Sequence, residues 1–405
     1  MSPMEVLVVF ADESDRAALS GLDGCKAHCI DAGIDHWKPT PGFDILEYVE
    51  RCRRFLQAHR VDGVVCFHDL GDLVAAILAQ EFGLPGTSIE SAFLCLHKYY
   101  TRQREPAPIR CEALSLWDPH PQVSNYPCFL KPPWLKLSLL GFRLDGAADL
   151  ARALALARRE YPGWQRQYLP LFEAAVDHDQ YPLAVADVFL VEELVEGQQV
   201  TVEGWVESGR VHLWAITDTN AYPGRNRAFD NFSLPSRHSP AIQRRLVEDS
   251  KRIIQRLGFE HGFFNAEFWC QPDRLVLIEV NGRAAASFDG LYQRCLGASV
   301  FEAATRLACG HAPAALPQVG GVVGGQFNFI TFASGWAHEL IDLDTARLHP
   351  DVSLFVAEGD WVEPVSDLGS VLAQVELFGS DYDQIKQQAD RLRRFLLRQP
   401  EASPW

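Results

Sequence analysis

The residues of this sequence best suited to chemistry are two glutamates, Glu267 and Glu279, in neighbouring apolar segments. The segments, 263–268 and 275–281, are expected to form antiparallel strands. Two carboxylates placed opposite each other, about 5 Å apart, repel and destabilise a sheet unless a cation lies between them. Carboxylate and amide oxygens are the ligands that Mg²⁺ prefers, and Mg²⁺ keeps further positions for water and phosphate oxygens. The pattern therefore predicts a magnesium site and phosphoryl transfer.

The register of this predicted hairpin follows from its loop. If the loop is the three residues 272–274, Gln271 pairs with Leu275 and Glu267 lies directly opposite Glu279. Because side chains alternate across a strand, one face then carries four polar residues, which are Asn265, Glu267, Glu279 and Asn281. A solvent-exposed face would also accept both glutamates, so the hairpin alone leaves the two interpretations open.

Several elements must position these residues, and the first of them form a small parallel α/β lobe over residues 1–90. Apolar runs at 6–10 and 61–67 are typical of buried strands, and the apolar spacing at 43–59 and 70–82 predicts helices. At 405 residues the chain suits two or three lobes. The elements expected farther along are strands at 126–131 and 188–194, hairpin arms at 200–207 and 211–217, helices at 147–159 and 240–257, strands at 327–332 and 352–356, and a terminal helix at 382–397.

The composition indicates which kinds of partner the protein has and in which cellular compartment it is expected. A formal net charge of -16 repels nucleic acid and anionic lipid, so neither a polynucleotide nor a membrane is expected as a partner. The ten cysteines show no metal-binding spacing and are expected to be buried free thiols. The chain starts without a basic and apolar leader, and no segment reaches the roughly 20 apolar residues of a membrane span. These features favour a cytoplasmic protein.

The segment 279–283 (EVNGR), after a strand that carries Glu267, resembles the ATP-grasp superfamily. The carboxylate-amine ligases of that superfamily pair a glutamate on one strand with an E-x-N-x-R segment on the next. The resemblance implies that Glu267, Glu279 and Asn281 hold one or two Mg²⁺ ions between the phosphates of ATP, with Mn²⁺ as an alternative metal. It also implies that Arg283 faces the acyl phosphate or the carboxylate substrate.

Two lysines upstream follow the order in which the family places its phosphate-binding lysines. Lys98 falls on a predicted helix, and Lys131 precedes Pro132 at the end of a predicted strand. The resemblance implies that both hold phosphate oxygens of ATP. Lys98 would also suit a solvated helix face, whereas Lys131 follows an apolar run and must meet either solvent or an anion.

Residues 191–197 (VEELVEG) resemble the family's hinge, where main-chain groups read adenine. The resemblance assigns this reading to Glu193 and Val195, with Glu192 beside them in the nucleotide site. An acidic strand end on the surface would have the same composition, so the interpretation of this segment as a hinge depends on the other motifs around it.

Two single residues depart from the family pattern. The family often has a ribose-binding glutamate two residues past the hinge glycine, and this chain has Gln199 there. An amide can still bond a hydroxyl, and Glu203, on the same expected strand face, is a candidate to share that role. Gly282 stands where proline is common.

Two loops are expected near the phosphates. Many relatives carry a glycine-rich loop after the phosphate-binding lysine, whereas residues 133–141 are bulky and offer only Lys136 and Ser138 to phosphate. This loop is expected to exclude water from an acyl phosphate or to suit an apolar substrate. Residues 218–227 are rich in turn-formers and are expected to form a long exposed loop. From that loop Arg225 or Arg227 would reach the terminal phosphate or stay solvated.

The resemblance implies an α/β fold, with α+β character in the grasp lobes, in three parts. Residues 1–90 would form an N-terminal α/β domain and residues 91–318 an ATP-grasp nucleotide-binding domain of antiparallel sheet and helices. Residues 319–405 would form a C-terminal lobe that completes the grasp fold, with the glycines at 320–325 interpreted as a linker.

The activity implied by the resemblance is that of an ADP-forming ligase. The enzyme would phosphorylate a small-molecule carboxylate and condense the acyl phosphate with an amine, most like the L-amino-acid ligases. Two alternatives stay open, an ATP-grasp enzyme with a non-amino-acid acceptor and a catalytically silent ATP-binding protein. The sequence also allows a homodimer.

Overall fold

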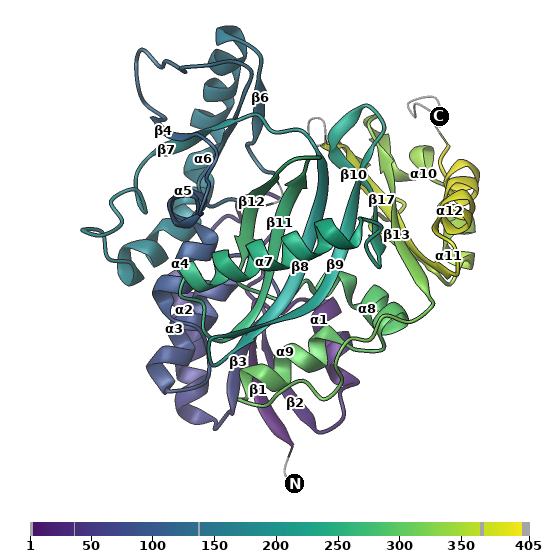
Figure 1. The fold of residues 1–405 in the computed structure, drawn as a ribbon, viewed down its shortest axis with the longest axis horizontal. Helices are drawn as coiled ribbons and strands as arrows, with labels where there is room; N and C mark the ends of the chain where they lie inside the picture. Colours follow the sequence, from purple (N-terminus) through teal and green to yellow (C-terminus); the bar gives the residue numbers. More distant parts are fainter. Residues whose placement is uncertain (1–2, 36, 137, 365–367, 399–405) are drawn as a thin grey trace.

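The structure is a computed structural model, and it describes residues 3–35, 37–136, 138–364 and 368–398. The side chains of residues 226 and 227 are likewise outside the description. A parallel sheet at the N-terminus is followed by antiparallel sheets with helices packed on them (Figure 1). The predicted fold class is therefore confirmed.

The N-terminal lobe holds a parallel sheet in the order β2 (Cys25–Ile30), β1 (Met4–Val9), β3 (Gly63–Cys66), with helices α1 (Glu13–Ser20), α2 (Ile45–Ala58) and α3 (Gly71–Phe82). β1 lies in the middle of the sheet, where its apolar run Val6–Val9 is fully buried. The edge strand β2 carries half-buried side chains without a continuous apolar run, so apolar patterning does not reveal it. Gly83 ends α3 in the left-handed conformation, as its position predicts.

A second lobe contains an antiparallel sheet in the order β4 (Cys111–Ser115), β7 (Val188–Glu193), β5 (Cys128–Lys131), β6 (Phe142–Leu144), with helices α4 (Ile89–Leu96), α5 (Lys98–Arg104) and α6 (Ala147–Ala175). The prediction that the helix ends at residue 159 was wrong, because α6 continues through Pro162 and Pro170. Each proline removes a backbone hydrogen bond. Buried side chains such as Tyr168 and Phe172, both in contact with the ring of Trp134, supply the packing that sustains the helix.

The largest sheet is antiparallel throughout and has the order β12 (Leu275–Asn281), β11 (Gly262–Cys270), β8 (Gln198–Glu207), β9 (Arg210–Tyr222), β10 (Arg225–Leu234), β13 (Val323–Thr331), β17 (Ser370–Gly379), β15 (Val352–Leu354). Helix α7 (Pro240–Arg256) crosses one face of this sheet in Figure 1, and it contacts β8 and β9. Ser239 caps α7 by accepting a hydrogen bond from the Ile242 backbone, and Pro240 occupies the first helical turn, as predicted.

The expectation of a long exposed loop at 218–227 was wrong. β9 extends to Tyr222 and β10 begins at Arg225, so only Pro223 and Gly224 form the turn. The polar residues that suggested a loop find partners inside the sheet. Asp218, for example, is buried and accepts hydrogen bonds from the Ser236 hydroxyl at 2.5 Å and the Arg237 backbone at 2.8 Å.

The C-terminal segment extends the same large sheet. The glycines at 324 and 325 lie buried inside β13, so their interpretation as a linker was wrong. Helix α12 packs on β13 and β17 where the terminal helix was expected. The remaining elements are α8 (Asp289–Leu296), α9 (Val300–Ala308), β14 (Gly335–Trp336), α10 (Ala337–Leu340), α11 (Leu343–Leu348), β16 (Trp361–Val362) and α12 (Tyr382–Leu396), with a short 3₁₀ turn, η1, at Ala286–Phe288.

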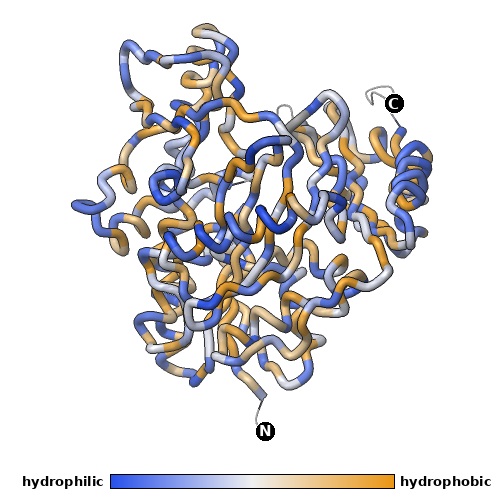
Figure 2. The backbone as a smooth tube through the Cα atoms, viewed as in Figure 1, coloured by the Kyte–Doolittle hydropathy of each residue, from blue (hydrophilic) through white to orange (hydrophobic). Residues whose placement is uncertain are grey.

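Hydropathy follows this layering. Apolar residues concentrate in the strands, whereas α7 and α12 are largely hydrophilic (Figure 2). All ten cysteines are free, seven of them buried and three half-buried, in agreement with the prediction of unpaired thiols. Within the described ranges, none of the helices has the length and apolar character needed to cross a membrane.

Helix α9 lies between β12 and β13 in the chain. It packs on the N-terminal lobe and contacts β1 and β3. The rings of Phe67 and Phe301 lie 4.6 Å apart between centroids at this contact. Gly63 of β3 lies directly beneath the backbone of Ala308, so closely that a Cβ atom at Gly63 would overlap the Ala308 carbonyl. The absence of a side chain at Gly63 therefore allows the two parts of the chain to meet.

We predict that Gly63→Ala lowers the free energy of unfolding by about 1–3 kcal/mol, because β3 and α9 must separate to admit a methyl group. Urea unfolding followed by far-UV circular dichroism measures the change. Gly359→Ala is the control, since nothing lies within 4 Å of a Cβ atom there. Equal stability of the two variants would contradict the close contact.

Candidate active site

The two glutamates lie opposite each other on β11 and β12, as the sequence predicts. The turn that leads to this register differs from the expectation, because Cys270 pairs with Leu275 in place of Gln271. A β-bulge then leaves Ile278 of β12 unpaired and restores the pairing of Glu267 with Glu279. The predicted pairing is correct although the predicted turn is not, since the bulge compensates for the one-residue difference.

Arg102 of α5 holds the carbonyls at this bulge. Its guanidinium donates to the Leu277 carbonyl at 2.5 Å and to the Ile278 carbonyl at 3.0 Å. Arg102 is 4% exposed, and its remaining donors bind the carboxylates of Glu105 and Glu192. Sequence reasoning missed this residue, because an arginine on a short helix three positions before a glutamate has the pattern of a surface pair.

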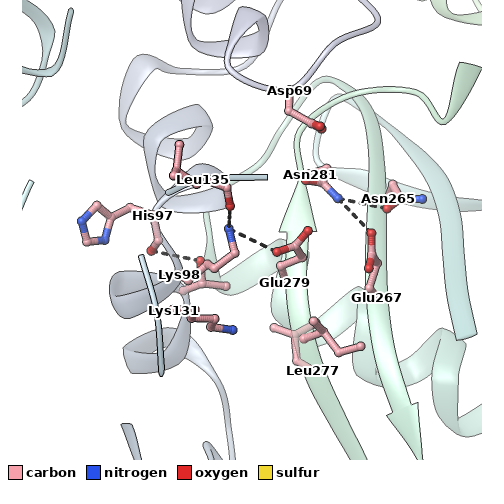
Figure 3. Close-up of polar contacts among 12 residues, drawn as sticks. Asp69, His97, Lys98, Lys131, Leu135, Asn265, Glu267, Leu277, Glu279 and Asn281 are labelled. Atoms are coloured by element: carbon pink, nitrogen blue, oxygen red, sulfur yellow. Dashed lines mark hydrogen bonds and ion pairs between the residues drawn. The ribbon is translucent and has the colours of Figure 1, made fainter. Parts of the chain in front are cut away.

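Glu267 lies among amide groups. The Gln199 side chain donates to one carboxylate oxygen of Glu267 at 2.7 Å, and the Asn281 amide lies 3.4 Å from the other. Asn281 also donates to Asn265 at 3.1 Å, so the four polar residues expected on one face do meet. Figure 3 shows Glu267 beside Glu279 on the neighbouring strand.

Glu279 is paired with a cation on its other side. The Lys98 ammonium group lies 3.2 Å from the Glu279 carboxylate and donates to the Leu135 carbonyl at 2.7 Å (Figure 3). Lys98 begins helix α5 and is buried, so it is not the solvated helix residue that the sequence left open. The loop after β5 thus closes over Lys98 from above the acidic pair.

Burial, and next the neighbouring Glu279 carboxylate, raise the pKa of Glu267 to about 8. The pair therefore carries less negative charge near neutral pH than two free carboxylates would. A divalent cation would displace the proton of Glu267 and bind both carboxylates. The donor set of two carboxylates and the Asn281 amide oxygen fits Mg²⁺, which prefers such oxygens. The residues present therefore suit the metal that the sequence pattern implies.

Arg283 follows β12 and meets the N-terminal lobe. Its guanidinium Nε lies 2.5 Å from the Asp69 carboxylate, on the turn between β3 and α3. The backbone N–H of the preceding Gly282 hydrogen-bonds the buried Asp72 at the start of α3. A proline at 282 would lack this N–H, so the departure from the family pattern has a structural reason here.

Lys131 belongs to a second buried charge cluster behind the acidic pair. Its ammonium group lies 2.7 Å from the Glu192 carboxylate, which Arg102 also binds at 2.8 Å. Burial would raise the pKa of Glu192, but the two cations outweigh burial and hold it at about 2. Glu105, which Arg102 also binds, is the second carboxylate of this cluster, so its two cations and two carboxylates are paired with one another.

Two cavities open beside Gly197, after the predicted hinge. The larger, about 520 Å³, lies along the β11–β12 turn and is lined by Glu196, Gly197, Cys270, Gln271, Pro272, Asp273 and Arg274. The other, about 330 Å³, is lined by Gly197, Gln198, Gln199, Thr219, Asn220, Ala221, Phe229 and Trp269. The second leads toward the acidic pair, because Gln199 lines it and contacts Glu267. Sequence reasoning did not single out Trp269.

Residues 124–290 match the protein family described as ATP-grasp domain, and this range contains β5, the predicted hinge and both strands of the acidic pair. The chain contains an ATP-grasp domain. The resemblance seen in the sequence is therefore confirmed. No curated protein matches the chain in sequence.

Solved structures share this ATP-grasp architecture over nearly the whole chain. An L-amino acid ligase from Bacillus licheniformis is 15% identical, with 98% of both chains covered and a TM-score of 0.77. A carboxyaminoimidazole ribonucleotide synthase from Aspergillus clavatus, complexed with ATP, is 15% identical over 96% of this chain and 97% of that chain, with a TM-score of 0.67. A biotin carboxylase from Campylobacter jejuni is 14% identical over 97% and 91%, with a TM-score of 0.65. At these identities the likeness concerns the fold.

The segment predicted to be the hinge, residues 191–197, makes contacts within the chain. The Glu193 backbone N–H donates to the Arg110 carbonyl at 3.0 Å, and its side chain binds Arg274 at 2.5 Å. Val195 is buried among Ile109, Val276 and Trp269. Their adenine-reading roles stay predictions.

Glu203 lies next to the polar face that carries the acidic pair. It is 1% exposed and accepts hydrogen bonds from Thr217 and from Asn265, which Asn281 also contacts, and it lies roughly 13 Å along β8 from Gln199. The ribose role of both residues stays a prediction. Ser138 is exposed on the loop after β5, and Lys136 of that loop is buried. Residue 137 of that loop lies outside the described residues.

The two arginines predicted to reach the terminal phosphate lie at the β9–β10 turn. The Arg225 guanidinium stacks over the ring of Phe332, 3.8 Å from its centroid, on the C-terminal segment. The side chain of Arg227 lies outside the described part of the chain. Their phosphate role stays a prediction, and it depends on this turn in place of the loop first expected.

We predict that Glu267→Gln changes the pH dependence of stability in the metal-free protein. The folded chain keeps the Glu267 proton to about pH 8, whereas the unfolded chain loses it near the ordinary value of 4.5. The folded state then binds more protons between these values, so its stability falls as pH rises through this window. The part of this fall that Glu267 contributes, on the order of a few kcal/mol, is absent in the glutamine variant, whereas the parts from Glu203 and Asp72 remain.

Urea unfolding with EDTA at several pH values from 5 to 8.5 measures this difference. Glu248→Gln, a change at an exposed residue of α7, is the control and should follow the wild type. Parallel pH profiles for the wild type and Glu267→Gln would contradict the raised pKa.

Proposed function

We propose that the chain is an ATP-dependent ligase that phosphorylates a small-molecule carboxylate and joins the acyl phosphate to an amine. ADP and phosphate are the other products. The observation that carries this proposal is the half-buried Glu267–Glu279 pair with Asn281, flanked by Lys98 on one side and Arg283 after the end of β12. Solved relatives of the same fold include an L-amino acid ligase, which supports an amine acceptor.

Binding of nucleotide and metal would use residues that already converge. Glu267, Glu279 and Asn281 would hold Mg²⁺, which when bound neutralises charge on the phosphates. The Lys98 ammonium group lies beside this set, and the Lys131 ammonium group lies in the adjoining charge cluster. Both ammonium groups are buried, so a phosphate oxygen meeting them experiences weak screening by solvent.

The chemistry needs no nucleophilic side chain. A carboxylate oxygen attacks the terminal phosphorus of ATP as the bond to the bridging oxygen breaks, and ADP leaves. The amine nitrogen then attacks the acyl carbon and loses a proton, and phosphate leaves with the electron pair of the broken bond. The role of the chain is to position the reactants and to offset charge, with Arg283 directed at the acid. The loop after β5, which the packing of Trp134 on α6 anchors, would help to exclude water beside Lys98.

Incubation with Mg·ATP and a pooled library of amino acids and small acids tests the proposal. Mass spectrometry identifies the product, and nucleotide chromatography distinguishes ADP from AMP. ADP with an amide product supports the ligase, and ADP with another product indicates a different acceptor. Tight ATP binding without ADP would favour a silent ATP-binding protein.

We predict that Glu279→Ala lowers the rate of ADP formation by at least about 100-fold, because the variant loses a metal ligand and leaves Lys98 without this carboxylate. The fold should persist, since the change also removes a like-charge pair. A coupled ADP assay and a thermal melt measure the two properties. Glu248→Ala, at an exposed position of α7, is the control. Undiminished ADP formation by Glu279→Ala would exclude the metal assignment.

A further inference from the structure

An ion pair between two lobes lies at the edge of the proposed site. Asp69 comes from the N-terminal lobe and Arg283 from the end of β12, and both side chains are mostly buried. Arg283 directs Nε and Nη2 at one Asp69 oxygen, and Nη1 at the Ala284 carbonyl. Figure 3 shows Asp69 directed toward the strand ends that carry Asn281 and Glu279. The arginine expected to meet the substrate is thus already bound to a carboxylate.

The pair belongs to a larger group of charged side chains, in which Arg283 also interacts with the Glu267 carboxylate. Asp72 lies three residues after Asp69, in the first turn of α3, and Lys136 reaches the group from the loop after β5. Two acidic and two basic side chains, all largely buried, therefore face one another from three separate segments. A ligand that entered with one uncompensated negative charge would disturb this balance, whereas a ligand with one charge of each sign would preserve it.

Resting on the proposed function, we propose that Asp69 is a specificity-determining residue that binds a positively charged amino group on the acid to be phosphorylated. The substrate enters as a zwitterion and replaces the internal ion pair. The substrate carboxylate binds the Arg283 guanidinium, and the substrate ammonium group binds the Asp69 carboxylate.

This exchange keeps every buried charge paired. An acid without the amino group would draw Arg283 away and leave Asp69 with weaker compensation, and a buried charge that loses its partner is strongly unfavourable. The proposed role also fits the position of Asp69 in a different lobe from Arg283. The turn between β3 and α3 closes the side of the site that faces Arg283, where the non-reacting end of the acid would lie.

Hydroxylamine offers a test that does not depend on the natural amine, because it converts an acyl phosphate into a hydroxamate. Hydroxamate formation with Mg·ATP is measured for the standard amino acids and for the matched acids that carry hydrogen in place of the α-amino group. We expect the wild type to prefer each accepted amino acid over its matched acid by at least about 30-fold in kcat/KM.

Asp69→Asn should reduce this preference to within a few-fold, mainly by raising KM for the amino acid. Glu81→Gln, on the exposed face of α3 where it pairs with Arg53, is the control and should keep the wild-type preference. Thermal melts of the three proteins show whether each is folded.

Two results would overturn the inference while leaving the proposed function intact. One is equal use of amino acids and matched acids by the wild type, which needs no variant and decides the matter even if Asp69→Asn does not fold. The other is a folded Asp69→Asn protein that loses both classes of substrate equally. Failure of the wild type to form hydroxamate from any acid would instead refute the proposed function and the inference with it.

Discussion

Two carboxylates on neighbouring strands repel each other, and this chain places Glu267 and Glu279 in that position inside a mostly buried site. The surrounding structure is arranged around this constraint. The bulge at Ile278 sets the register, Arg102 holds the bulge carbonyls, and Lys98 compensates the outer carboxylate. An enclosed like-charge pair is costly unless a cation joins it, so its presence within a hydrogen-bond network points to ligand binding more than to stability.

The site depends on contacts between distant segments. Lys98 and Arg102 lie on one short helix, one turn apart, and both reach β12 from the lobe that precedes the large sheet. Asp69 reaches Arg283 from the N-terminal lobe. Because α9 returns to that lobe and packs on β3, the turn that carries Asp69 is held against the end of β12. Each lobe therefore supplies charge to a site that none of them could form alone.

Predictions from sequence patterns were correct where the pattern had a local physical cause. Apolar runs, the cap at Ser239 and the left-handed glycine after α3 depend on near neighbours, and the structure confirms these elements. It failed where tertiary contacts outweighed local preference. Polar residues such as Asp218 bond inside the sheet in place of forming a loop, and buried aromatic packing carries α6 past two prolines. The correct pairing of the glutamates rested on a wrong turn that the bulge compensated.

The sequence by itself determined the fold class, the ATP-grasp resemblance and the face shared by Asn265, Glu267, Glu279 and Asn281, because strand alternation and motif spacing are properties of neighbouring residues. Only the tertiary structure decided the bulge, its Arg102 support and the Asp69–Arg283 pair. Those contacts join residues far apart in the chain. Their formation depends on how complete lobes pack, and no local pattern in the sequence encodes that packing.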